Sequence, residues 1–135
     1  MSTMLTINIA AEAARNDAFR RVVFTTGHVQ VVLMTLKPGE DIGAEVHEAN
    51  DQILHFVTGA VQAEIGGEAR PVGPGDLVVV PAGTRHNFTN TGAEPARFYT
   101  IYGPPDHAPD TVHQTKADAE AAERAGTDVP PAEHN

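Results

Sequence analysis

The chain has 135 residues, no cysteine, no tryptophan and a formal net charge of −9. The lack of cysteine excludes disulfides, thiolate zinc sites and a cysteine nucleophile. An acidic chain without a Lys/Arg cluster is a poor candidate for binding nucleic acid or an anionic membrane, and no apolar run is long enough for a transmembrane helix. Since the N-terminus also lacks a secretory pattern, we expect a cytoplasmic, single-domain protein.

The first 17 residues form a lead-in to the predicted domain. Residues 7–17 are rich in alanine and carry one apolar stripe, which is too short to make a stable isolated helix. We therefore predict a short helix or an irregular segment here.

Residues 18–102 have the pattern of many short β-strands separated by Gly, Pro and Asn turns. Gly66-Gly67 is a two-residue hairpin signal within this region. About nine short strands at regular spacing indicate an all-β barrel or sandwich. The expected strands are 19–26, 28–36, 42–47, 52–58, 61–65, 68–72, 76–80, 85–90 and 96–102.

Residues 103–135 form an acidic tail of different character, which holds seven of the 18 acidic residues but two of the nine basic ones. Residues 116–125 predict a short helix, with Thr115 as its N-cap and Gly126 at its end. The apolar residues of this helix are all alanine, so we expect it to pack loosely. Residues 127–135 are predicted to be disordered.

Four polar side chains in the strand region suggest a metal site. Glu45 and His47 are two residues apart and would share one face of a strand. Gln52 and His86 could meet them from neighbouring strands. A carboxylate, two imidazoles and an amide oxygen in an apolar interior would bind one divalent metal ion.

Each of these residues also has a simpler interpretation. His47 could be a surface histidine, and Glu45 a solvated carboxylate at a strand edge. Gln52 could hold a metal-bound water, because amide oxygens bind transition metals weakly. His55 should point to the opposite face from Gln52. The remaining histidines are weaker candidates: His28 near the barrel mouth, and His107, His113 and His134 in the tail.

Two stretches of the sequence resemble the two signature motifs of the cupin family. The second motif is matched throughout, whereas the first has Glu45 in place of its usual first histidine and Gln52 in place of its usual glutamate. The first motif corresponds to Gly39, Glu45, His47, Gln52 and Gly59, and the second to Gly75, Pro81, Gly83, His86 and Asn90. The resemblance implies a double-stranded β-helix (jelly-roll) barrel over residues 18–102 with a short C-terminal helix.

The resemblance also implies several possible functions. Two histidines and a carboxylate are similar to the iron site of dioxygenases, which would act on a small enolic or phenolic molecule. Zinc sugar-phosphate isomerases among small cupins use Gln, two His and Glu, although we find no Lys/Arg pair near the motifs to hold a phosphate. A non-catalytic, metal-stabilised cupin that binds a small ligand is the alternative. The metal could be Zn, Fe, Mn or Ni.

Small cupins of this kind usually form homodimers, sometimes through an N-terminal arm. The apolar strand at residues 28–36 and the lead-in exceed what one small barrel needs. We therefore expect a homodimer, in which residues 1–17 could serve as a dimer arm.

Overall fold

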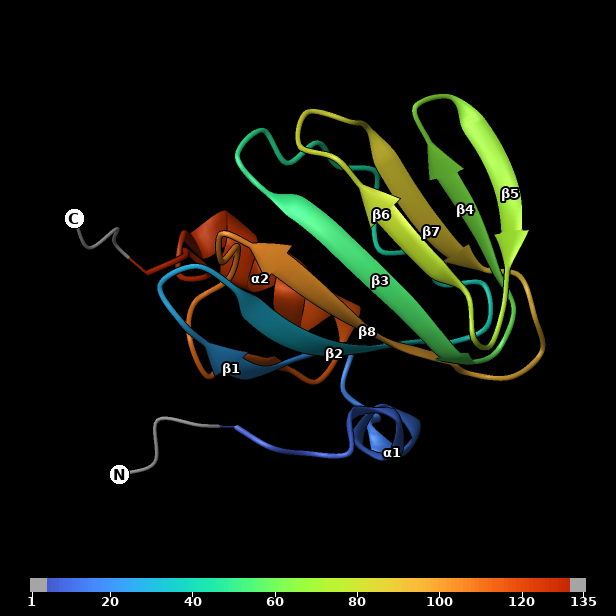
Figure 1. Ribbon diagram of the computed structural model, residues 1–135, viewed down its shortest axis with the longest axis horizontal. Helices are drawn as coiled ribbons and strands as arrows, with labels where there is room; N and C mark the ends of the chain where they lie inside the picture. The colour runs from blue at the N-terminus through green and yellow to red at the C-terminus, as the bar shows by residue number, and fades with distance from the viewer. Residues whose placement is uncertain (1–4, 132–135) are drawn as a thin grey trace.

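The computed structural model describes residues 5–131, which form two antiparallel β-sheets and two helices (Figure 1). Residues 1–4 and 132–135 of the predicted lead-in and tail lie outside the described residues. The elements are α1 (Ile9–Arg15), β1 (Arg20–Thr25), β2 (Gln30–Leu36), β3 (Asp51–Thr58), β4 (Val61–Ile65), β5 (Glu68–Val72), β6 (Leu77–Val80), β7 (His86–Asn90), β8 (Ala96–Gly103), β9 (Val112–His113) and α2 (Lys116–Ala125).

The two sheets enclose a core between them, which confirms the predicted all-β barrel. The larger sheet has the strand order β6-β3-β8-β2-β1-β9, and the smaller one the order β5-β4-β7. Alternate residues of each strand point inward, and β8 is buried at every second position. The centre of the core is aromatic: the ring of Phe56 lies 5.0 Å from that of Phe98 and 5.8 Å from that of Phe88.

The segment 42–47 differs from its prediction, because it is not a regular strand. It runs beside β7 and makes isolated bridges, in which Asp41 is opposite Thr89 and Glu45 is opposite His86. Gly43 interrupts the ladder, since its φ is +106° and its N–H donates to the Asn87 side chain at 3.0 Å. A residue with positive φ does not continue a β-ladder, so this motif segment is extended but irregular.

Gly59 shows why the first motif ends in glycine. Its φ is +88°, and a Cβ atom at this position would lie 2.6 Å from the Cα atom of Ala96. Any larger residue would push β8 away from the turn between β3 and β4.

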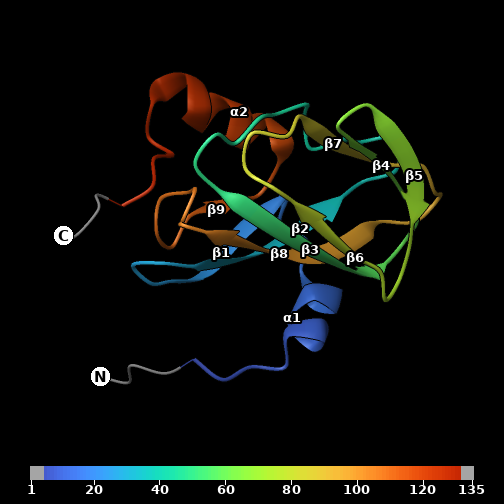
Figure 2. The ribbon, with the colours of Figure 1, turned by 45° about the horizontal axis from the view of Figure 1, so that its top comes forward.

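The lead-in forms the predicted short helix, α1, on the outer side of the larger sheet (Figure 2). Asn16, just after the helix, is buried and donates to Thr35 Oγ1 at 3.0 Å. Arg97 donates to the Asn16 carbonyl at 3.0 Å, so β2 and β8 together hold the end of the lead-in.

The tail is more ordered than predicted. Helix α2 has the predicted bounds and caps, and Thr115 and Asp118 form a capping box. The expectation of loose packing is wrong for Ala119, which is 6% exposed and belongs to the hydrophobic core. The tail also adds β9 to the edge of the larger sheet beside β1. Neither helix in the described part of the chain has the length and hydrophobicity to cross a bilayer.

The prediction of disorder from residue 127 onward is also wrong for the part that the structure describes. The side chain of Asp128 is 8% exposed and accepts from the Ala108 N–H and the His107 ring, in the segment that follows β8. A local sequence pattern does not show a contact of this kind, because the partner of Asp128 lies 21 residues earlier in the chain.

Candidate metal centre

The inward side chains change from apolar to polar toward one end of the barrel, which we call the open end. On β3, Phe56 and Leu54 are followed toward this end by Gln52, and on β8 Phe98 is followed by Thr100 and Tyr102. All six of these residues are at most 2% exposed. The barrel thus places buried polar groups at the end where the two motif segments meet.

Backbone hydrogen bonds join the two motif segments directly. The N–H of Glu45 donates to the His86 carbonyl at 3.0 Å, and the N–H of His86 donates to the Glu45 carbonyl at 2.9 Å. The N–H of Gly83 donates to the His47 carbonyl at 2.8 Å. These bonds fix the positions of three predicted ligands relative to one another.

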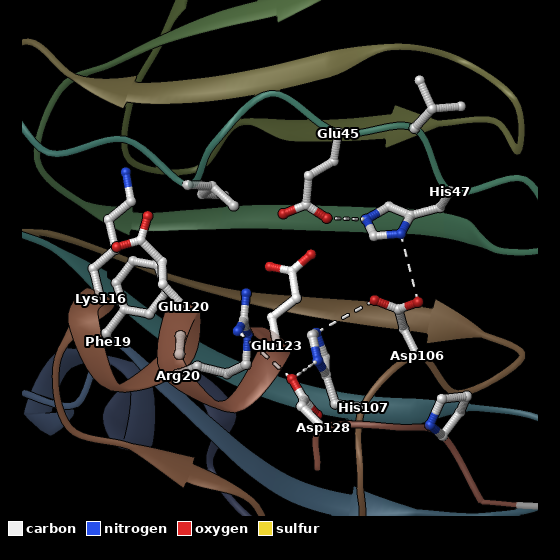
Figure 3. A pocket seen from close by; sticks show the side chains of 14 residues that line it. Phe19, Arg20, Glu45, His47, Asp106, His107, Lys116, Glu120, Glu123 and Asp128 are labelled. Atoms are coloured by element: carbon white, nitrogen blue, oxygen red, sulfur yellow. Dashed lines mark hydrogen bonds and ion pairs between the residues drawn. The ribbon is translucent and has the colours of Figure 1, made fainter. Parts of the chain in front are cut away.

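Glu45, His47 and His86 are neighbours at the open end. Nε2 of His47 lies 3.1 Å from Oε2 of Glu45 (Figure 3), and the ring centroids of His47 and His86 are 5.1 Å apart. Two atoms that bind one ion at about 2.1 Å lie roughly 3.0 to 3.4 Å from each other. The separation between Glu45 and His47 therefore suits two ligands of the same ion.

Both histidines have one ring nitrogen committed to an acceptor. Nδ1 of His86 lies 2.9 Å from the Thr84 carbonyl oxygen, so this nitrogen must carry the hydrogen. Nδ1 of His47 lies 3.5 Å from Oδ1 of Asp106. Metal-binding histidines commonly donate their second N–H to a carboxylate or a backbone carbonyl, which orients the ring and its free nitrogen. In His86, Nε2 is the nitrogen left to bind an ion, whereas Nε2 of His47 faces Glu45 and would bind an ion after losing its proton.

Gln52 is buried with its amide oriented by two donations. Its Nε2 donates to Thr100 Oγ1 at 3.0 Å and to the Tyr102 hydroxyl at 3.2 Å. Its Oε1 is buried and has no hydrogen-bond partner among the described residues. A buried carbonyl oxygen without a partner is costly, and an ion or a polar ligand would remove that cost.

The donor types and their outer partners fit a divalent ion, although the arrangement is incomplete. Among residues 5–131, no three histidine, cysteine, aspartate or glutamate side chains are grouped as a metal site would require. Gln52 would have to supply the remaining oxygen, as the sequence predicts. The ligand set Glu45, His47, Gln52 and His86 therefore stays a prediction, for which the geometry gives a physical basis.

The charges around His47 favour its protonated form. Burial by itself would lower the pKa of His47, but the hydrogen bonds and charges of Asp106 and Glu45 outweigh it and raise the pKa to about 10. Burial raises the pKa of Asp106, and its contact with His47 and the nearby charge of His107 more than reverse this, so the pKa is lowered. Burial raises the pKa of Tyr102 far above its usual value, which keeps this hydroxyl neutral.

A cavity of about 370 Å³ lies beside Glu45 and His47, between the barrel and α2 (Figure 3). Sequence reasoning missed several of its residues, because they come from β1 and the tail rather than from the motifs. Two of them are basic, but Lys116 pairs with Asp41, and Arg20 lies 3.9 Å from Asp128. The missed residues are Arg20, Asp106, Lys116, Glu120, Glu123 and Asp128.

The other histidines occupy different places around the barrel. His55 points outward and lies 5.2 Å from the Tyr99 ring, as predicted from strand alternation. His28 is exposed in the turn between β1 and β2. His113 is 8% exposed, with Nδ1 3.5 Å from Arg20. His107, one of the weaker candidates for the metal site, is buried and lines the cavity.

Comparison with known proteins agrees with this architecture. A protein of Bacillus halodurans of known structure, BH2720, has 43% identity and a TM-score of 0.86, and the match covers 87% of this chain and 94% of that one. The uncharacterised protein YrkC of Bacillus subtilis is 45% identical over 123 residues, or 87% of this chain, which spans 66% of the relative's length.

A more distant relative carries a functional name. Polyketide synthase CurC of Streptomyces cyaneus is 29% identical over 89 residues, which are 66% of this chain and 56% of that protein. The family model for the cupin domain matches residues 32–102, which include both motifs and most of the barrel. The double-stranded β-helix predicted from the motifs is thereby confirmed, and the chain belongs to the cupin family.

Proposed function

We propose that this protein is a metal-binding cupin that acts as an enzyme on a small polar organic molecule. The single observation that carries the proposal is the Gln52 oxygen, which is buried without a described hydrogen-bond partner at the end of the barrel where Glu45, His47 and His86 meet. Cupins often bind metal ions, and Glu45, His47, Gln52 and His86 would hold the ion here. Bound there, a divalent ion would supply Lewis-acid catalysis or, as iron, dioxygen chemistry.

The surrounding residues would hold and orient the substrate. Phe19 and Ile42 give the cavity an apolar side. The side chain of Glu45, which is 35% exposed, belongs to the candidate centre and also lines the cavity. The neutral hydroxyl of Tyr102 donates or accepts hydrogen bonds without adding charge. His47 would give up its proton to bind the ion, and Asp106 would then hold the hydrogen on Nδ1.

The charges of the cavity favour a neutral or cationic substrate. Its five carboxylates outnumber the basic side chains Arg20 and Lys116, both of which face carboxylates of this chain. A phosphate would be repelled unless these pairs were broken, so we place a sugar phosphate below an enolic or phenolic molecule. The name of the Streptomyces cyaneus relative, a polyketide synthase, is consistent with such a substrate.

A turnover screen tests the proposal. The protein, stripped with chelator and reloaded with Zn, Fe, Mn or Ni, would be assayed for oxygen uptake and isomerisation on small enolic and phenolic compounds. We expect turnover with one metal, its loss in a folded His86→Ala variant and its retention in His28→Ala, which changes an exposed histidine in a turn. No turnover with any metal, together with tight binding of a compound, would favour the non-catalytic alternative.

We also propose that the protein forms a homodimer through the outer face of β3 and β6. Leu77, Val79 and Ile53 are 61%, 54% and 36% exposed on that face, and large exposed apolar groups on one face are typical of an interface. The extended residues before α1 include the exposed Leu5 and Ile7 and run alongside the barrel without belonging to either sheet (Figure 1). We propose no nucleic-acid or membrane partner.

Light scattering would test the dimer. We expect a mass of twice 14.3 kDa and a shift to the monomer in Val79→Glu, which buries a charge at the proposed interface. A monomer at micromolar concentration in the unmodified protein would contradict it.

A further inference from the structure

A line of alternating acidic and basic side chains connects the candidate centre to the segment after α2 (Figure 3). Each imidazole in the line lies between two carboxylates, so the position of one group constrains the next. The successive separations are 3.1 Å from Glu45 Oε2 to His47 Nε2, 3.5 Å from His47 Nδ1 to Asp106 Oδ1, 3.4 Å from Asp106 Oδ2 to His107 Nε2, 2.8 Å from His107 Nδ1 to Asp128 Oδ2, and 3.9 Å from Asp128 Oδ2 to Arg20 Nη1.

The middle of this line is fixed to the barrel by Gln30, which is fully buried on β2. Oε1 of Gln30 accepts from the backbone N–H groups of Asp106 and His107, at 3.1 and 2.9 Å. Nε2 of Gln30 donates to the His107 carbonyl at 2.8 Å. The backbone of this turn is thus held, and the ring orientation of His107 is the remaining freedom.

Asp128 removes that remaining freedom. One of its oxygens accepts from the Ala108 N–H at 3.0 Å, and the other lies 2.8 Å from Nδ1 of His107. The Tyr102 ring packs edge-on against both imidazoles, at 5.2 Å from His107 and 5.7 Å from His47. A change in the orientation of His107 would therefore reach His47 through both Asp106 and Tyr102.

We propose that Asp128 is a positioning residue for the predicted metal ligand His47 and that the segment after α2 is part of the site. This inference rests on the proposed metal centre and names a group that no cupin motif contains. The links from His107 to Asp106 and from Asp106 to His47 are charge contacts at 3.4 and 3.5 Å, since Nε2 of His107 has no hydrogen-bond partner among the described residues. Through these contacts the Asp128 carboxylate favours the His47 ring orientation with Nδ1 toward Asp106 and Nε2 toward Glu45. A carboxylate that directly accepts from a metal-binding histidine typically changes metal affinity by tenfold to a hundredfold when removed; here that carboxylate is Asp106, and Asp128 acts on it through His107, so its removal should have a smaller effect.

Asp128→Asn is the most direct test, because asparagine keeps an oxygen for the Ala108 N–H and loses the charge that faces His107. Asp110→Asn is the matched control: Asp110 is an exposed carboxylate in the same part of the chain, with φ of 59°, a conformation that asparagine accepts. Zinc affinity would be measured by calorimetry, and the cobalt-loaded protein would be compared by visible absorption. The histidine rings would be followed by long-range ¹H–¹⁵N NMR without metal.

We expect Asp128→Asn to remain folded by circular dichroism, to bind zinc severalfold more weakly and to alter the cobalt spectrum, with Asp110→Asn like the unmodified protein. The His47 ring signals should shift in Asp128→Asn alone. Unchanged His47 signals would overturn the inference, as would unchanged zinc affinity in a protein that binds zinc. If the unmodified protein binds no metal while the His47 signals still shift, the proposed function fails and the positioning role stands.

Discussion

The two ends of the barrel are built from the same strands but differ in the polarity of their inward side chains. From the centre of the core toward the other end, which we call the closed end, the inward residues of β3, β7 and β8 include Phe56, Phe88 and Phe98, which are fully buried, and the Phe56 ring contacts the other two. At the open end, the same strands present Gln52, His86 and Tyr102. The closed end therefore gains stability from apolar burial. The open end gains less, because it buries polar groups that lose their contact with water.

Burial and hydrogen bonding serve different purposes along one strand. Apolar side chains at the closed end need only the correct volume and shape. Polar side chains at the open end need specific partners, such as Thr100 and Tyr102 for the amide of Gln52. The buried Gln52 oxygen has no such partner among the described residues, which is the reason we propose it as part of a binding site.

The largest expected effect is a core truncation at the closed end. Phe98→Ala should lower the free energy of unfolding by about 3–5 kcal/mol, because it leaves a cavity beside Phe56. At the open end, Tyr102→Phe keeps the ring and should cost only about 1 kcal/mol, since it removes one hydrogen bond to Gln52. Urea unfolding measures both. Equal losses would break the distinction between the two ends.

The second prediction concerns the pH dependence of metal binding at the open end. Because the pKa of His47 is raised to about 10, the ion must displace a proton at every pH below that value. Affinity should therefore rise with pH, by about tenfold per unit for one proton released. Calorimetry in buffers of different ionisation enthalpy would count the protons. An affinity independent of pH between 6.5 and 8.5 would rule out His47 as the proton donor.

A smaller effect is expected from Asp128, whose pKa is lowered to about 2. Burial by itself would raise this pKa, but the hydrogen bond and charge of His107 reverse the effect. A carboxyl with a lowered pKa stabilises the fold above its unfolded value of about 4, and this stability is lost as pH falls toward 2. The unmodified protein should lose about 1–2 kcal/mol more than Asp128→Asn over that range. Parallel acid-unfolding curves for the two proteins would contradict this.

The fold could be predicted from the sequence because its signals are local. Glycine, proline and asparagine mark the turns between strands, and the second motif from Gly75 to Asn90 is complete. Helix α2 could be predicted with its ends, because Thr115 and Gly126 are capping residues. The segment 42–47 was predicted wrongly, since the backbone conformation of Gly43 depends on the side chain of Asn87.

The candidate site could be predicted only in part, because its outer groups come from distant parts of the chain. Glu45, His47, Gln52 and His86 lie in motifs and carry recognisable spacing. Asp106, His107 and Asp128 lie in a tail whose composition is typical of a solvated segment. Their contacts with Gln30 and Arg20 span at least 76 residues, and local composition gives no sign of such contacts.

Metal stoichiometry would show whether the polar groups of the open end surround one divalent ion. Protein purified without chelator or nickel resin would be analysed for elements, then stripped and titrated with Zn, Fe, Mn and Ni in turn. We predict one ion per chain for at least one metal, with affinity reduced at least tenfold in a folded Gln52→Leu variant. Folded protein that neither retains nor takes up any of these ions at a stoichiometric level would contradict the account.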